Sequence, residues 1–157
     1  MAKRILIALD ESENAARVVS LVAETFEKDN EIILLSVLPK LVSACELNEP
    51  TLIAHFKSEH SLFCQAEEHK ENVLGEALHN AKNKLLEAGF KESKISAQLA
   101  KQRKGIANDI VAKAQELNAD IIVMGRRGIS GLKEFFLGSV SHKVLQLCKD
   151  RSVLLAQ

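Results

Sequence analysis

Short apolar runs alternate along the chain with stretches whose apolar residues recur at helical spacing. Four apolar runs are typical of strands buried on both faces of a sheet, and a fifth segment alternates. Together they predict strands at residues 4–9, 31–38, 94–100, 120–125 and 152–156. Helical spacing predicts helices over residues 15–26, 73–88, 106–117 and 140–148. This alternation predicts an α/β fold: a parallel sheet with helices on both faces, joined by right-handed crossovers.

Residues 40–60 interrupt this order, because they show no clean period and contain Pro50. They predict a long loop or a short helical insert. Gly89 follows the second helical stretch and is a candidate helix C-cap. No repeat, low-complexity tract or linker is found, so we expect one domain over residues 1–157, with 40–62 as a variable insert.

The composition argues against several classes of partner. Lys and Arg together number 21, as do Asp and Glu, so no net charge attracts the chain to nucleic acid or membranes. Tyr and Trp are absent, which argues against base-stacking platforms, and no apolar run approaches the length of a membrane span. Cys45, Cys64 and Cys148 form no CxxC pair, so we expect reduced thiols and a cytoplasmic protein.

The segment that most strongly indicates a ligand site follows the fourth predicted strand. Four of the seven glycines lie there, namely Gly125, Gly128, Gly131 and Gly138. In open parallel sheets, ligands bind beyond the carboxyl ends of the strands. Gly138 and Ser139 also open the last predicted helix, where free N–H groups attract phosphate. The stretch therefore predicts a phosphate site with two walls, to which the Ser139 and Ser141 hydroxyls can add hydrogen bonds.

Other interpretations of these residues stay open. No Walker A or G-x-G-x-x-G motif occurs, and glycines after a strand are often turn residues only. Arg126, Arg127 and Lys133 could offset phosphate charge or simply be solvated. Asp10, at the end of the first strand, could bind ribose hydroxyls or cap the next helix, a role for which Ser12 competes.

The glycine spacing resembles a known signature. Gly125, Gly128, Gly138 and Ser139 fit G-x2-G-x9-G-(S/T), the nucleotide-binding signature of the universal stress protein family. "ILIALDESENA" (5–15) and "LLSVLP" (34–39) resemble that family's first two strands, so the similarity covers essentially the whole chain.

The resemblance implies an open sheet of strand order 3-2-1-4-5 that binds ATP, often with Mg²⁺ or Mn²⁺, across the ends of strands one and four. It also implies a homodimer formed through residues 152–156. The implied nucleotide-binding residues are Ala8, Asp10, Val37, Met124, Gly125, Arg127, Gly128, Gly138, Ser139, Val140 and Ser141.

Some positions depart from the family pattern. Ala8 stands where Pro or Val is common, and Ser152 where Pro is common. The Arg126-Arg127 pair is more basic than the usual residues there, which would favour phosphates or another anionic partner.

The favoured function is an ATP-binding stress or regulatory module. Glu134 is the only acid near the predicted phosphates, so efficient hydrolysis is not expected. The alternatives are a weak ATPase or phosphotransferase, a dimerising protein of the same fold without nucleotide, and a binder of another adenine-containing cofactor.

A metal site is the least favoured hypothesis. His60 and Cys64 are four residues apart, and His69 follows. A structural zinc site needs four ligands, and the second pair is missing. We therefore expect no metal ligands from protein side chains.

Overall fold

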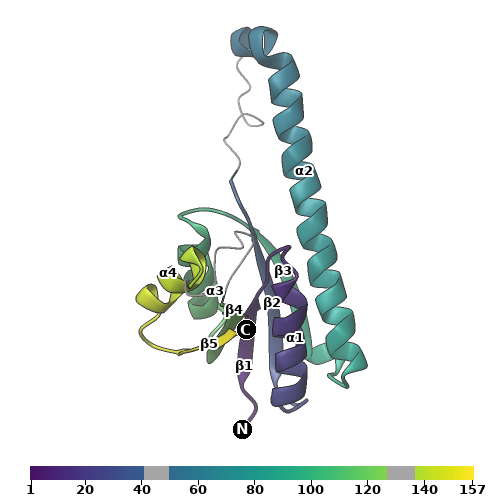
Figure 1. The fold of residues 1–157 in the computed structure, drawn as a ribbon, viewed down its shortest axis with the longest axis vertical. Coiled ribbons are helices and arrows are strands. Elements are labelled where there is room, and N and C mark those ends of the chain that lie inside the picture. The colour runs from purple at the N-terminus through teal and green to yellow at the C-terminus, as the bar shows by residue number, and fades with distance from the viewer. Residues whose placement is uncertain (41–49, 127–136) are drawn as a thin grey trace.

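The computed structural model describes residues 1–40, 50–126 and 137–157 and contains one parallel sheet (Figure 1). The strands lie in the order β3-β2-β1-β4-β5, as the resemblance implied. The strands are β1 (Arg4–Ala8), β2 (Glu31–Leu38), β3 (Ile95–Lys101), β4 (Ile121–Gly125) and β5 (Ser152–Ala156). The helices are α1 (Asn14–Thr25), α2 (Pro50–Glu87), α3 (Ile106–Glu116) and α4 (Ser139–Leu147), with a 3-10 turn, η2 (Glu92–Lys94).

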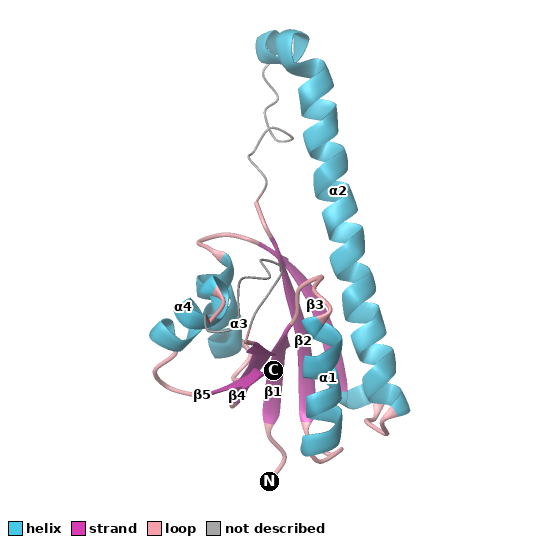
Figure 2. Ribbon diagram, in the orientation of Figure 1, coloured by secondary structure: helices cyan, strands magenta, loops and turns pink. Residues whose placement is uncertain are grey.

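Alternate residues of each strand face opposite layers of helices. Ile5 and Ile7 of β1 pack with α1 and α2 on one face, and Leu6 packs with α3 and α4 on the other (Figure 2). Because helices cover both faces, the strands can be apolar throughout, and Leu34 and Leu35 are both fully buried. The predicted fold class is therefore confirmed, and the bounds of β2 and β5 agree with those expected from the sequence.

Gly89 has the predicted role at the end of α2. Its N–H donates to the Leu86 carbonyl at 3.0 Å, and the next N–H, of Phe90, donates to the Leu85 carbonyl at 3.1 Å. These two bonds form a Schellman motif, which requires the left-handed backbone that Gly89 adopts at φ +96°.

The length of α2 corrects the sequence prediction. Residues 50–60 belong to this 38-residue helix, so neither a loop nor a short insert forms there; residues 41–49 lie outside the described part. Figure 1 shows that the first half of α2 extends beyond the sheet, whereas its second half lies against it. An apolar stripe is needed only where a helix packs on a core, so periodicity detects the second half alone.

Charged side chains join the elements at the amino ends of the strands. Arg4 makes an ion pair with Glu31 at 2.8 Å and donates from Nη1 to the Leu117 carbonyl, also at 2.8 Å. Arg151 donates to the carbonyls of Ala114 and Ala119 at 2.7 and 2.9 Å. These bonds satisfy backbone carbonyls where α3 ends.

The cysteines differ from expectation. Cys148 is a free, buried thiol, whereas Cys64 is disulfide-bonded. The prediction of reduced thiols is thus wrong at Cys64, because spacing along the chain does not show which cysteines the fold brings within bonding distance. The expected cytoplasmic location loses that support. In the described part of the chain, no helix is both long and apolar enough to cross a membrane.

Candidate functional site

A cavity of about 260 Å³ opens beyond the carboxyl ends of β1, β2 and β4. This is the place where the strand order reverses: β1 continues to β2 on one side and neighbours β4 on the other. Ligands of open parallel sheets bind at such a reversal. The cavity is close in size to the smaller ligand pockets of proteins, about 300 Å³ and above.

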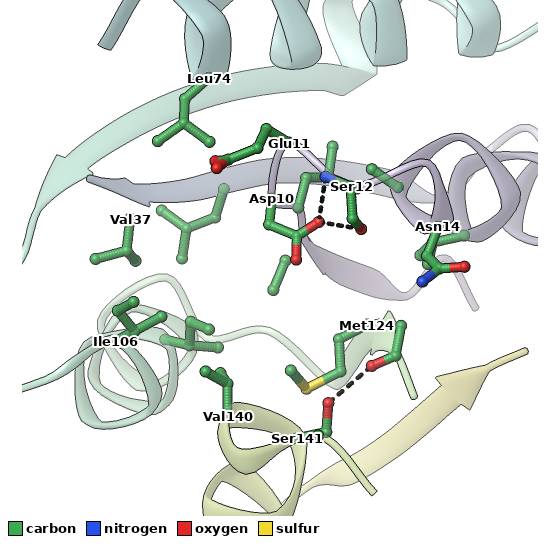
Figure 3. Close-up of a pocket in the computed structure, with 18 of the residues that line it drawn as sticks. Asp10, Glu11, Ser12, Asn14, Val37, Leu74, Ile106, Met124, Val140 and Ser141 are labelled. Atoms are coloured by element: carbon green, nitrogen blue, oxygen red, sulfur yellow. Dashed lines mark hydrogen bonds between the residues drawn. The ribbon is translucent and has the colours of Figure 1, made fainter. Parts of the chain in front are cut away.

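Asp10 lies in the middle of this cavity, on the loop that follows β1 (Figure 3). One carboxylate oxygen, Oδ1, accepts hydrogen bonds from the Ser12 hydroxyl and from the Ser12 N–H, the latter at 2.9 Å. The residue before α1 is Glu13, which makes no side-chain capping bond. The N-cap residue of α1 is therefore neither Asp10 nor Ser12, the two candidates that the sequence offered. The Ser12 bonds instead hold the Asp10 carboxylate against the cavity.

The start of α4 forms the wall opposite the β1 loop. Gly138 donates its N–H to the Arg126 carbonyl at 2.9 Å, which joins the helix start to the end of β4. The Ser141 hydroxyl donates to the Gly125 carbonyl at 2.8 Å, and the Ser141 side chain is buried (Figure 3). The first turn of α4 therefore faces the tip of β1 across the cavity. The Ser141 hydroxyl and the Gly138 N–H serve this attachment, so a ligand would meet the helix start through the N–H groups that follow Gly138 and through Ser139, which lines the cavity.

Apolar side chains line the remainder of the cavity. Val37 from β2 lies near Ile106 from α3, and Met124 and Val140 lie on the β4 and α4 side (Figure 3). An apolar compartment beside a few polar groups suits a ligand with a flat ring and a polar tail.

The structure brings together nine of the eleven nucleotide-binding residues expected from the sequence. They are Ala8, Asp10, Val37, Met124, Gly125, Gly138, Ser139, Val140 and Ser141. Arg127 and Gly128 lie outside the described residues, as does Lys133. Arg126 is half-buried beside the site and is not among the residues that line the cavity.

Sequence reasoning missed the contribution of α2. Leu74 and Lys70 of this helix line the cavity, and so does Glu11 of the β1 loop. A signal was present: Leu74, Leu78 and Ala81 form the buried stripe of α2, and Lys70 occupies the preceding position of that stripe.

The described residues hold no group of three or more His, Cys, Asp or Glu side chains that could bind a metal ion. A Mg²⁺ ion bound with a nucleotide is usually held by phosphate oxygens and water, with one or two carboxylates. Asp10 and Glu11 are the carboxylates that line the described part of the cavity. The site thus offers oxygen ligands of the kind that such an ion takes.

Comparison with known proteins agrees with this architecture. The chain matches the universal stress protein family over residues 1–155. It is 35% identical over 150 residues to the universal stress protein YxiE of Bacillus subtilis, an alignment that covers 94% of each chain. It is 30% identical over 156 residues to the universal stress protein MJ0577 of Methanocaldococcus jannaschii, covering 93% of this chain and 90% of that protein.

Solved structures show the same fold. The structure of MJ0577 superposes with a TM-score of 0.69 at 28% identity, covering 99% of this chain and 96% of that one. A universal stress protein from Archaeoglobus fulgidus in complex with dAMP superposes with a TM-score of 0.61 at 20% identity, covering 100% and 98%. The sheet, the cavity at its strand reversal and these similarities lead to one conclusion: the chain belongs to the universal stress protein family.

Proposed function

We propose that this protein binds an adenine nucleotide, ATP in particular, and acts as a nucleotide-dependent regulatory module in a stress response. The observation that carries the proposal is the cavity in which the β1 tip, with Asp10, faces the start of α4 at Gly138. Helix N-termini bind phosphate, and carboxylates at strand ends bind ribose hydroxyls. The A. fulgidus protein of this fold was solved with dAMP, which supports the adenine part of the proposal.

Each part of the nucleotide has a matching part of the cavity. The adenine ring would pack between Val37 and Ile106, and the ribose would meet the Asp10 carboxylate. The phosphates would lie against Gly138 and Ser139, whose backbone opens α4. A Mg²⁺ or Mn²⁺ ion bound with ATP would neutralise part of the phosphate charge.

Replacement of Gly138 by valine tests the proposal. Gly138 has φ −58° and ψ 147°, a conformation that any residue adopts, so the variant is expected to fold. The valine side chain would stand where the phosphates approach the helix, and ATP affinity should fall by about tenfold or more. Titration calorimetry with ATP and Mg²⁺ measures this change.

Gly75→Val is the matched control. Gly75 lies in α2 and does not line the cavity, and a side chain added there meets nothing within 4 Å. The control should bind ATP as the wild type does. If Gly138→Val binds ATP equally well, the phosphates do not lie at α4. If the wild-type protein binds neither ATP nor AMP, the proposed function is wrong.

A dimer formed through β5 is part of the proposal. β5 is at the end of the sheet order, and no other strand of the described residues pairs with its outer edge, so a second copy could pair there. Val153, Leu154 and Leu155 are only half-buried in the single chain. Light scattering coupled to size-exclusion chromatography should give the mass of two chains, and the mass of one chain would contradict this part.

A further inference from the structure

Helix α2 supplies a charged wall to the cavity through Lys70. The buried stripe of α2 runs through Leu85, Ala81, Leu78 and Leu74, and Lys70 lies one helical turn before Leu74 on the same face. The chain therefore places an ammonium group where the stripe reaches the edge of the domain. Lys70 and Leu74 both line the cavity, so this face of α2 is directed at the ligand space.

Lys70 forms an ion pair with Glu11 of the β1 loop. Both side chains are largely covered, with exposed fractions of 26% for Lys70 and 21% for Glu11. Partly covered charges are screened less by solvent and salt than surface pairs are. The pair therefore contributes to the electrostatic potential inside the cavity.

In the described part of the cavity wall, the charges do not balance. Among the described residues that line it, the anionic groups are Asp10 and Glu11, and the cationic group is Lys70. Without Lys70, two carboxylates would face an anionic ligand. Like charges a few ångströms apart in a partly covered site repel each other by energies that change affinity severalfold.

We propose that Lys70 is a specificity-determining residue of this site: by neutralising Glu11, it lets the cavity accept anionic adenine nucleotides in preference to uncharged adenosine. The inference rests on the proposed function, since it assigns the charge preference of the same cavity. Lys70 comes from a different wall than the α4 start, so it acts in addition to the backbone N–H groups there.

A purely mechanical role is the competing explanation. The pair could serve only to fasten α2 to the β1 loop. In that case its removal would lower stability, and any change in affinity would be the same for charged and uncharged ligands. The charge proposal instead requires an effect that grows with the number of phosphates.

The experiment compares adenosine, AMP and ATP by titration calorimetry on the full chain. Lys70→Met keeps helix propensity and removes the charge. We expect ATP affinity to fall about tenfold, AMP affinity about threefold and adenosine affinity less than about twofold. Glu11→Gln removes the repelling carboxylate, so ATP affinity should rise about threefold while adenosine affinity stays the same.

Lys82→Met is the matched control. Lys82 lies on the same helix and makes an ion pair with Glu92 at 2.8 Å, away from the cavity. It should leave the three affinities unchanged. Circular dichroism and urea unfolding of each variant give its fold and stability. Because Glu11→Gln and Lys70→Met should change ATP affinity in opposite directions, a general loss of folding cannot imitate the result.

Equal losses for the three ligands in Lys70→Met would overturn the proposal and leave nucleotide binding intact. ATP affinity that is unchanged in both Lys70→Met and Glu11→Gln would also overturn the proposal and leave nucleotide binding intact. A wild-type protein that binds none of the three ligands would instead reject the proposed function, and this inference with it.

Discussion

The two ends of the sheet use charged residues in different ways. At the amino ends of the strands, Arg4 and Arg151 are engaged with carboxylates and with the backbone carbonyls around the end of α3. At the carboxyl ends, Asp10, Glu11 and Lys70 line a cavity. The same sheet thus separates residues that hold the fold together from residues that face a ligand. Substitutions at one end should change stability, and substitutions at the other should change affinity.

Arg151→Met, at the amino ends of the strands, is expected to give the largest change in stability while leaving ATP affinity nearly unchanged. Arg151 is 12% exposed and donates to the carbonyls of Ala114 and Ala119, and of these two the Ala114 carbonyl keeps the Ala119 N–H as a donor. Removal of such charge-assisted bonds should lower the free energy of unfolding by about 2–3 kcal/mol. Urea denaturation measures the loss. ATP affinity should stay within about twofold of wild type, and a parallel loss of affinity would show that the two ends are not independent.

Asp10→Asn tests the carboxyl ends of the strands, where substitutions should change ATP affinity rather than stability. The asparagine oxygen can still accept the Ser12 N–H, so stability should change by less than about 0.5 kcal/mol. The ribose hydroxyls would lose a charged acceptor, and affinity for ATP should fall about tenfold. Asp29→Asn, at an exposed position between α1 and β2, is the control. Calorimetry that shows no difference between the two variants would remove Asp10 from the ligand site.

Glu31→Gln should give the smallest effect, a slight loss of stability near neutral pH that disappears at acidic pH. Arg4 and then Lys94 lower the pKa of Glu31 below its ordinary value of 4.5. The paired carboxylate therefore contributes stability above pH 4.5, and this contribution is lost as pH falls through the lowered pKa. Both partners are about 40% exposed, so the contribution is small.

Unfolding curves of wild type and Glu31→Gln, recorded from pH 7 to pH 3, measure this contribution. The wild type should be slightly more stable near neutrality, and the difference should vanish at the acidic end of the series. A difference that grows as the pH falls would contradict the sign of the pKa shift. Nucleotide binding at pH 7 should be the same in both proteins.

The sequence predicted those features that one local pattern determines. The strand Glu31–Leu38 is apolar over its length because both faces are buried, and its bounds were predicted correctly. The left-handed turn at Gly89 was visible from the glycine after a helical stripe. Of the residues that line the cavity, the sequence predicted those at the carboxyl ends of strands, Asp10 after β1, and those that open α4.

Features that depend on distant parts of the chain were missed. The first half of α2 lies beyond the sheet, so no stripe marks it. Lys70 and Glu11 are 59 residues apart, and only the packing of α2 against the β1 loop makes them partners. The disulfide bond of Cys64 was missed for the same reason: the spacing of residues along the chain does not show which residues the fold brings close together.

The length of α2 has a hydrodynamic consequence. At about 1.5 Å per residue, its 38 residues follow a helical path of roughly 57 Å, most of it in the long segment after the bend near its start (Figure 1). A compact chain of 157 residues has a radius of gyration of only about 15 Å. The protein should therefore diffuse as an elongated particle, and X-ray scattering in solution should show a tail of long interatomic distances that a sphere of this mass lacks.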